Sequence, residues 1–231
     1  MKKQKVKFSN ASTEFYFDAR FSLLRSIGSK RNTTLLTDEH VFSAHKDKFR
    51  GWNVIVLKPG ESFKVQATAD AVIEQLIALE AGRDHLLVGI GGGVVTDLTG
   101  YIASIYLRGI RFGYIPTTIL GLVDASIGGK NGIDVNGYKN LAGTIRQPAF
   151  ILHDLSFLSS LPEKEWINGF AEVIKHAAIK DAGMFRDLEK NVLAFYKKDR
   201  KVEHYYEYTF WVNIAGAIHS SIFSYQNKRN V

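Results

Sequence analysis

A short apolar run that ends in three consecutive glycines restricts the fold of this chain more than any other feature. Residues 86–90 (Leu-Leu-Val-Gly-Ile) predict a buried strand, residues 91–93 are glycines, and a helical pattern begins near Val94. At such a turn, backbone N–H groups and the positive end of the helix dipole converge on one point, which suits a phosphate group. The dinucleotide fingerprint G-x-G-x-x-G is incomplete, because Thr96 stands where the third glycine is expected. Taken alone, the segment is equally compatible with a dinucleotide site and with a plain glycine turn.

Other β-branched runs alternate with helical patterns over the first two thirds of the chain. The predicted strands are residues 33–37, 54–57, 86–90, 112–116 and 150–153. Between the second and third of these, apolar residues recur at helical spacing. This alternation is typical of a parallel sheet covered by helices. After residue 162 the strand signals end, and we predict helices over residues 163–180, 184–196 and 203–223.

Composition excludes several classes of protein. Of the 231 residues, 45% are hydrophobic, which is enough to form a sizeable core and excludes a disordered chain. No apolar run is long enough to span a bilayer, so we expect a soluble, cytoplasmic protein with no membrane partner. There is no cysteine, so a metal would have to be held by His, Asp or Glu.

The net charge of +7 comes from three short basic runs, and we expect no nucleic-acid partner. These runs lie within residues 2–7, 197–201 and 228–229, and the rest of the chain is not basic. Clustered lysines of this kind are commonly solvated surfaces or tails.

Residues 116–143 form a second glycine-rich region, which we predict to be a long loop. It contains Asp124, Lys130, Asp134, Lys139 and Asn140 among six glycines. Lysines on flexible backbone suit phosphate or carboxylate groups, because they act as mobile point charges. The alternative is a surface loop with solvated lysines, although compact domains seldom keep such long loops without a function.

The predicted helix over residues 163–180 carries three polar side chains on one face. Glu172 is followed by Lys175 three residues later and by His176 four residues later. Judged locally, Glu172 is either a metal ligand or, more simply, the ion-pair partner of Lys175. Taken alone, His176 is more simply interpreted as a histidine packed in the protein interior than as a metal ligand.

Six segments together resemble one enzyme family. GGGVVTDLTG, YLRG, PTTIL, VDASIGGKNG, YKNLAG and GFAEVIKHA occur in the order and spacing of the 3-dehydroquinate synthases, which belong to the sugar phosphate cyclases. The resemblance covers roughly residues 35–190. It implies an α/β fold with a Rossmann-like N-terminal nucleotide-binding domain over residues 1–154, followed by an all-helical substrate and metal domain over residues 155–231. It also implies a phosphate-eliminating lyase of the shikimate pathway of aromatic amino acid biosynthesis. That enzyme uses NAD and a divalent metal, zinc or cobalt, to convert 3-deoxy-arabino-heptulosonate 7-phosphate into 3-dehydroquinate and phosphate.

The resemblance also assigns roles to individual residues. Those implied to border the cofactor are Asp38, Glu61, Lys64, Gly91, Gly92, Gly93, Val94, Asp97, Thr117, Thr118, Lys130, Lys139, Phe157 and Ser160. Those implied to act on the anionic sugar-phosphate substrate are Asp124, Lys130, Lys139, Asn140, Lys175 and Arg108. Arg108 matches an arginine that reaches the site of a neighbouring subunit, which implies a homodimer. Glu172 matches the carboxylate ligand of the metal.

The end of the sequence departs from the family pattern. Family members are longer, and their further helical part supplies two histidine ligands in motifs that do not occur here. We therefore expect the helical domain to be incomplete, with Glu172 as the sole ligand of a weakly bound or absent metal, because catalytic zinc normally takes three protein ligands. His204 and His219 are too far apart on one predicted helix to bind the same ion. Three alternatives stay open: a catalytically inactive NAD-binding remnant, a related sugar phosphate cyclase, and an iron-type polyol dehydrogenase.

Overall fold

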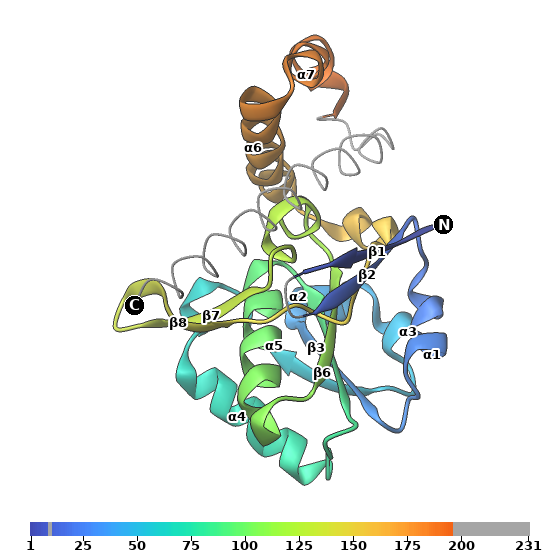
Figure 1. Ribbon diagram of the computed structural model, residues 1–231, viewed down its shortest axis with the longest axis vertical. Coiled ribbons are helices and arrows are strands. Elements are labelled where there is room, and N and C mark those ends of the chain that lie inside the picture. The colour runs from blue at the N-terminus through green and yellow to red at the C-terminus, as the bar shows by residue number, and fades with distance from the viewer. Residues whose placement is uncertain (9–10, 196–231) are drawn as a thin grey trace.

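The computed structural model describes residues 1–8 and 11–195, and its centre is a seven-stranded sheet (Figure 1). The strands of this sheet are β1 (Lys2–Lys7), β2 (Ser12–Phe17), β3 (Thr33–Asp38), β4 (Asn53–Leu57), β5 (Leu86–Gly91), β6 (Arg111–Pro116) and β9 (Phe150–Leu152), in the order β1-β2-β9-β6-β5-β3-β4. Only the β1–β2 pair is antiparallel within this sheet; the other neighbours are parallel. The expected α/β fold with a parallel sheet is confirmed.

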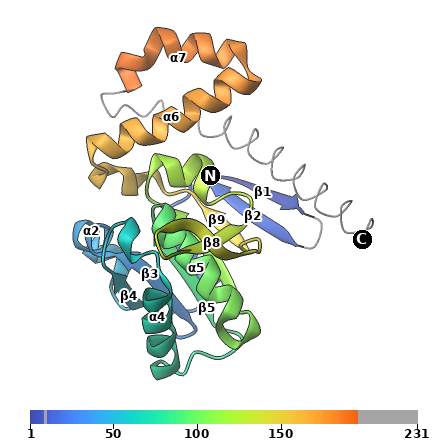
Figure 2. The ribbon, with the colours of Figure 1, turned by 90° about the vertical axis from the view of Figure 1, so that its left-hand side faces the viewer.

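Helices cover both faces of the sheet, and Figure 2 shows one of these faces. The helices are α1 (Leu24–Ile27), α2 (Glu39–Ala44), α3 (Lys46–Phe49), α4 (Gln66–Ala78), α5 (Gly93–Ile105), α6 (Glu163–Lys180) and α7 (Ala182–Phe195), with short turns η1 (Phe21–Leu23), η2 (Glu61–Phe63), η3 (Tyr106–Arg108), η4 (Gly121–Ala125) and η5 (Leu155–Ser160). Alternate residues of β5 show the two layers, since Leu87 packs in the core under α4 and α5 while Val88 packs in the core under α1–α3. Every residue of β5 is buried, as expected for a central parallel strand.

Glycine brings α5 very close to the sheet. A Cβ on Gly89 would overlap the side chain of Thr99, so only glycine at this point of β5 allows the helix to approach so closely. In the dinucleotide fingerprint, the third glycine has this packing role. Here Thr96 takes that third position; it is buried, and its hydroxyl donates to the Gly93 carbonyl at 3.0 Å.

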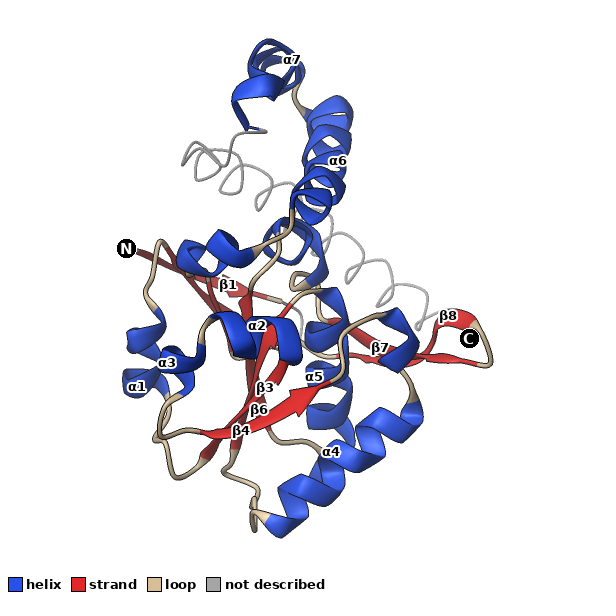
Figure 3. Ribbon diagram, turned by 180° about the vertical axis from the view of Figure 1, so that it is seen from behind, coloured by secondary structure: helices blue, strands red, loops and turns tan. Residues whose placement is uncertain are grey.

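The prediction of a long loop over residues 116–143 is wrong, because most of this segment forms regular secondary structure. It forms the turn η4 and a hairpin of β7 (Lys130–Val135) and β8 (Tyr138–Ile145), seen to the side of the sheet in Figure 3. Asn136 and Gly137 connect the strands with φ values of 49° and 83°. An Asn-Gly pair at two positive φ angles is the preferred two-residue hairpin connection, so the sequence did contain the signal.

The sequence analysis also missed β1 and β2. The lysines of β1 alternate along an exposed edge strand, where Lys3 pairs with Glu14 at 3.0 Å. Lysine on an edge strand discourages pairing with another chain. The five predicted strands and the helices over residues 163–180 and 184–196 are confirmed, to within a residue or two at their ends. The predicted helix 203–223, His204, His219 and the basic runs 197–201 and 228–229 lie outside the described residues.

Helices α6 and α7 extend away from the sheet at its upper end (Figure 1). α6 is anchored at its N-terminal half, where Trp166 and Gly169 are buried. A Cβ on Gly169 would overlap the side chain of Ile119 and lie 2.9 Å from the backbone nitrogen of Leu120, so α6 lies directly against the segment that leads into η4. Among residues 1–8 and 11–195, no helix has both the length and the apolar character needed to cross a bilayer.

Candidate active-site cleft

A cleft of about 1710 Å³ opens where the parallel strands end. Asp38 ends β3, Gly91 ends β5, and Thr117 follows β6. The backbone N–H of Thr117 donates to the Gly91 carbonyl at 3.0 Å. In open parallel sheets, ligands bind outside the carboxyl ends of the strands. The predicted site residues that line this cleft are Asp38, Glu61, Lys64, Gly92, Gly93, Val94, Asp97, Thr117, Thr118, Asp124, Lys130, Asn140 and Ser160.

The glycine turn at the start of α5 leaves its backbone unshielded. Gly92 is the N-cap residue and contributes no side-chain cap. A Cβ on Gly92 would lie 3.0 Å from Thr118, whereas a Cβ on Gly93 would lie 3.6 Å from Ala125, which is an ordinary contact. None of these glycines has a positive φ, so the turn needs glycine for close approach and not for backbone freedom. The first N–H groups of α5 therefore face the cleft without a side-chain partner, as an anion site requires.

Lys64 gathers three carboxylates on one side of the cleft. Its side chain is 5% exposed, and its Nζ lies 3.0 Å from Glu61, 3.5 Å from Asp97 and 3.5 Å from Asp134. The same Nζ donates to Asn140 Oδ1 at 2.9 Å. Asn140 in turn donates its backbone N–H to Asp134 Oδ1 at 2.8 Å. This network ties the β7–β8 hairpin to η2 and α5.

The network shifts the pKa values of Lys64 and Asp97. Burial alone would lower the pKa of Lys64, but the hydrogen bond to Glu61 and the charges of Asp97, Glu61 and Asp134 outweigh it, so this pKa is raised. Burial raises the pKa of Asp97 to about 6, although Lys64 opposes the shift. Asp97 therefore changes its charge within the physiological pH range.

A second cluster lies between η4 and α6. Candidate ligand atoms of Asp124, Glu172 and His176 all lie within 4.8 Å of one another. His176 Nε2 is 4.0 Å from Glu172 Oε2, and Lys175 forms an ion pair with the same carboxylate. Burial, and next the charge of Lys175, lower the pKa of His176. The predicted ion pair is present, and two further donors lie beside Glu172, although the sequence analysis expected it to be alone.

Asp124, Glu172 and His176 fit a divalent metal chemically. Two carboxylates and a neutral imidazole are ligands that zinc and cobalt both accept. His176 Nδ1 is buried and makes no hydrogen bond within the described residues, whereas Glu172 Oε2, also buried, has the ammonium group of Lys175 as its ion-pair partner. The sequence signal for His176 was its spacing of four residues from Glu172 on one helix, but nothing in the sequence showed that Asp124 would meet them.

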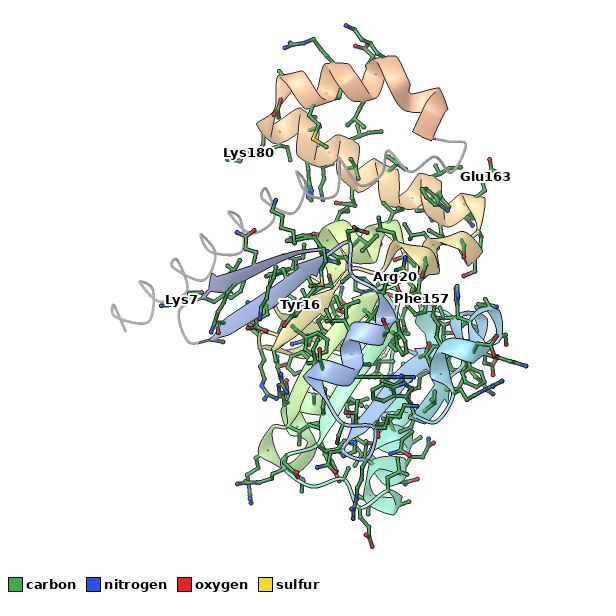
Figure 4. All side chains as sticks on the ribbon, turned by 90° about the vertical axis from the view of Figure 1, so that its right-hand side faces the viewer. Lys7, Tyr16, Arg20, Phe157, Glu163 and Lys180 are labelled. Carbon is green, nitrogen blue, oxygen red and sulfur yellow. The ribbon has the colours of Figure 1, made fainter. Side chains whose placement is uncertain are left out.

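Several predicted site residues do not line the cleft. Gly91 is buried behind the glycine turn, and Lys139 is exposed and lies 3.7 Å from Glu61. Arg108 is exposed on η3. Phe157, labelled in Figure 4, is 1% exposed. Its ring packs against those of Phe21 and His45, so this side chain is not available to a cofactor.

Comparison with known proteins identifies the family. Residues 54–168 match the sequence profile described as 3-dehydroquinate synthase N-terminal. The 3-dehydroquinate synthase of Thermodesulfovibrio yellowstonii is 37% identical over 216 residues, which cover 87% of this chain and 60% of the relative. That of Saccharolobus solfataricus is 44% identical over 147 residues, which cover 64% of this chain and 42% of the relative. This chain belongs to the 3-dehydroquinate synthase family.

A solved structure shows the same fold. The 2-epi-5-epi-valiolone synthase of Streptomyces hygroscopicus, solved with NAD⁺ and Zn²⁺ bound, superposes with a TM-score of 0.81 at 27% identity. The match covers 90% of this chain and 61% of that one. This chain thus spans about 60% of the length of the Thermodesulfovibrio yellowstonii and Streptomyces hygroscopicus proteins.

Proposed function

We propose that this chain carries the NAD-binding part and much of the substrate-binding part of a 3-dehydroquinate synthase. The reaction would convert 3-deoxy-arabino-heptulosonate 7-phosphate into 3-dehydroquinate and phosphate, in the shikimate pathway and in the cytoplasm. The observation that carries this proposal is the cleft at the carboxyl ends of the strands, which has the unshielded glycine turn, Lys64 with Glu61 and Asp97, and Asp124 along its walls. A dinucleotide and an anionic sugar phosphate can meet in such a cleft.

The glycine turn would hold the pyrophosphate of NAD. The free N–H groups at the start of α5 and the helix dipole both favour an anion there. Asp38 lines the neighbouring wall, with its Oδ1 already accepting from the backbone N–H groups of His40 and Val41. Glu61, with Asp38, would bind hydroxyl groups of the nucleotide. Thr117 and Thr118 follow β6 beside the turn.

The β7–β8 hairpin and α6 would hold the substrate. Lys130 and Asn140 line the cleft from the hairpin. Lys139 and Lys175 are exposed cations near that wall and near Glu172, where they would bind phosphate or carboxylate oxygens. When bound, NAD supplies a reversible hydride acceptor, and a divalent metal held at Glu172 supplies charge that polarises a substrate oxygen.

The rest of the arrangement follows from family membership. We propose a homodimer in which Arg108, exposed on η3, contacts the partner subunit's cleft. We also propose the domain division at residues 154 and 155, with α6 and α7 beginning the helical domain. The same chemistry on another sugar phosphate, or NAD binding without turnover, are the alternatives.

Calorimetric titration with NAD tests the cofactor site. Gly93→Asp adds a carboxylate at the first residue of α5, where the side chain has room and the helix dipole favours it, so the fold is retained. We expect NAD affinity to fall at least tenfold. Gln66→Glu is the matched control, because it adds the same charge at the first residue of α4, outside the cleft. Unchanged NAD binding by Gly93→Asp would show that the pyrophosphate does not bind at this turn.

Phosphate release tests the reaction. The chain is incubated with NAD, Zn²⁺ or Co²⁺, and either 3-deoxy-arabino-heptulosonate 7-phosphate or glucose 6-phosphate. Release from the heptulosonate alone supports the synthase. Release from glucose 6-phosphate alone favours a related cyclase, and NAD binding without any release favours the inactive remnant.

A further inference from the structure

We propose that Asp134 is a positioning residue of the cleft: its carboxylate holds a bulge in β8 and thereby presents the side-chain amide of Asn140 to a bound substrate. This inference rests on the proposed function and deepens it, because it concerns how one substrate-binding side chain is placed. The resemblance to the family gives Asp134 no role. Asp134 acts through Asn140 and does not itself contact the reacting atoms.

The bulge follows from the register of the β7–β8 hairpin, which is seen in Figure 3. The regular pairs on either side of it are Ile133 with Ala142 and Val135 with Tyr138. Between these pairs, Asp134 on β7 therefore lies opposite residues 139–141 of β8. A bulge interrupts the ladder, bends the strand and re-aims side chains, and bulges recur next to active sites.

Lys139 and Asn140 show how the bulge changes the direction of side chains. Consecutive residues of a regular strand point to opposite faces of the sheet. Here both side chains reach η2 or the residue that follows it. Lys139 Nζ lies 3.7 Å from Glu61 Oε1. Asn140 Oδ1 lies 2.9 Å from the Nζ of Lys64, the residue after η2. The bulge therefore turns two neighbouring side chains toward the same wall of the cleft.

Asn140 lies in this bulge with a left-handed backbone. Its φ is 54°, a region that asparagine adopts more readily than most residues with a Cβ. Its backbone N–H donates to Asp134 Oδ1 at 2.8 Å, so a side-chain oxygen satisfies a donor that the interrupted ladder leaves out. A hydrogen bond to a carboxylate is charge-assisted and stronger than a neutral one. Asp134 therefore stabilises the backbone conformation that gives the Asn140 side chain its direction.

Asp134 is itself fixed by the segment after η2. Its backbone N–H donates to the Lys64 carbonyl at 2.7 Å, and it forms an isolated parallel bridge with Val65. The side chain of Asp134 is 13% exposed, and its Oδ1 lies 3.5 Å from Lys64 Nζ. The carboxylate therefore cannot turn away from Asn140 without leaving the ammonium group of Lys64.

The side-chain amide of Asn140 has one end fixed and the other end available to a ligand. Its Oδ1 accepts from Lys64 Nζ at 2.9 Å, and an ammonium group only donates, so the oxygen end must face Lys64. The N–H₂ end makes no hydrogen bond within residues 1–8 and 11–195, and Asn140 lines the cleft. Two N–H donors suit a phosphate, carboxylate or hydroxyl oxygen of a sugar phosphate.

Hydrogen exchange of the Asn140 backbone N–H, followed by nuclear magnetic resonance, tests the contact without any ligand. We expect Asp134→Ala to speed this exchange by about tenfold or more, whereas Asp134→Asn, which keeps an acceptor oxygen, should change it little. Asp84→Ala is the matched control, because Asp84 also accepts from an asparagine, Asn32, at 2.9 Å, but lies before β5, away from the cleft. Equal exchange in Asp134→Ala and in the unmodified chain would show that Asp134 does not hold Asn140.

Calorimetric titration with 3-deoxy-arabino-heptulosonate 7-phosphate, in the presence of NAD, tests the effect on the substrate. We expect Asp134→Ala and Asn140→Ala each to weaken binding by about fivefold, as for one lost hydrogen bond, and Asp134→Asn to keep most of the affinity. Both Asp134 variants remove the same charge beside Lys64, so the difference between them reports the acceptor oxygen alone. Loss of a negative charge by itself would strengthen the binding of an anion, which is the opposite of the expected result.

A double variant separates a positioning role from a direct one. If Asp134 acts through Asn140, then Asp134→Ala combined with Asn140→Ala should bind the heptulosonate little more weakly than Asn140→Ala alone. The affinity for NAD, measured separately, should change little in all of these variants, whereas partial unfolding would weaken the binding of both ligands. Equal affinities of Asp134→Ala and Asp134→Asn would overturn the inference and leave the proposed function standing. Failure of the unmodified chain to bind the heptulosonate would instead contradict the proposed function, and the exchange measurement would still decide whether Asp134 holds Asn140.

Discussion

Replacing Asp97 by Asn should stabilise the chain, and more so at higher pH. Burial raises the pKa of Asp97 to about 6 in the folded chain, from the ordinary aspartate value of 3.8. Below about pH 4, Asp97 is protonated in both the folded and the unfolded chain and carries no penalty. As the pH rises from about 4 through about 6, the unfolded chain loses this proton more readily than the folded chain, and the folded chain becomes less stable. Asn has nearly the same shape as the protonated carboxyl group and never ionises.

The size of the effect follows from the two pKa values. The shift from 3.8 to about 6 corresponds to a penalty of about 3 kcal/mol once Asp97 is fully ionised. At pH 5 Asp97 is ionised in the unfolded chain while it is still mostly protonated in the folded chain, so the penalty is about half as large. The Asn variant should therefore gain about 1–2 kcal/mol more at pH 8 than at pH 5. Lys64 keeps Glu61 and Asp134 as partners in the variant.

Urea unfolding at pH 5 and pH 8, without NAD, measures this difference. Asp70→Asn is the control, because it makes the same replacement at an exposed carboxylate on α4. If Asp97→Asn gains no more stability at pH 8 than at pH 5, Asp97 does not carry the burial penalty. If it loses stability at both, the ion pair with Lys64 outweighs burial.

Two further substitutions test the walls of the cleft. Lys64→Met leaves Glu61, Asp97 and Asp134 without their shared cation. We expect the free energy of unfolding, measured with urea, to fall by about 3–5 kcal/mol. A large part of this loss should be recovered at low pH, where the carboxylates are protonated. Gly137→Ala places a Cβ at φ +83° in the hairpin connection, so we expect a loss of about 1 kcal/mol; an equally stable variant would show that the positive φ is not required.

The sequence predicted those parts of the fold that depend on local periodicity. The β-branched runs placed five strands of the sheet, since buried parallel strands are apolar throughout. The glycine triplet placed the turn at the start of α5, and helical spacing placed Glu172, Lys175 and His176 on one face of α6. The β7–β8 hairpin was missed although its Asn-Gly connection is a local signal, because the density of glycines favoured a loop.

Contacts between distant segments could not be predicted in this way. Phe157 matched a cofactor-side segment of the family, but its ring packs in the core beside Phe21, because η5 presents that face to the sheet. Lys64 lies in a short turn between predicted elements, and only the folded chain shows that carboxylates from η2, α5 and β7 surround it.

The sequence by itself determined the strand-and-helix order, the glycine turn and the face of α6, because each depends on residues close together in the chain. Tertiary structure alone decided that Asp124 meets Glu172 and His176. The physical reason is the close crossing of α6 over the segment before η4. That crossing depends on the missing side chain of Gly169 and on the burial of the helix face around it, and no local pattern records which distant turn a helix will contact.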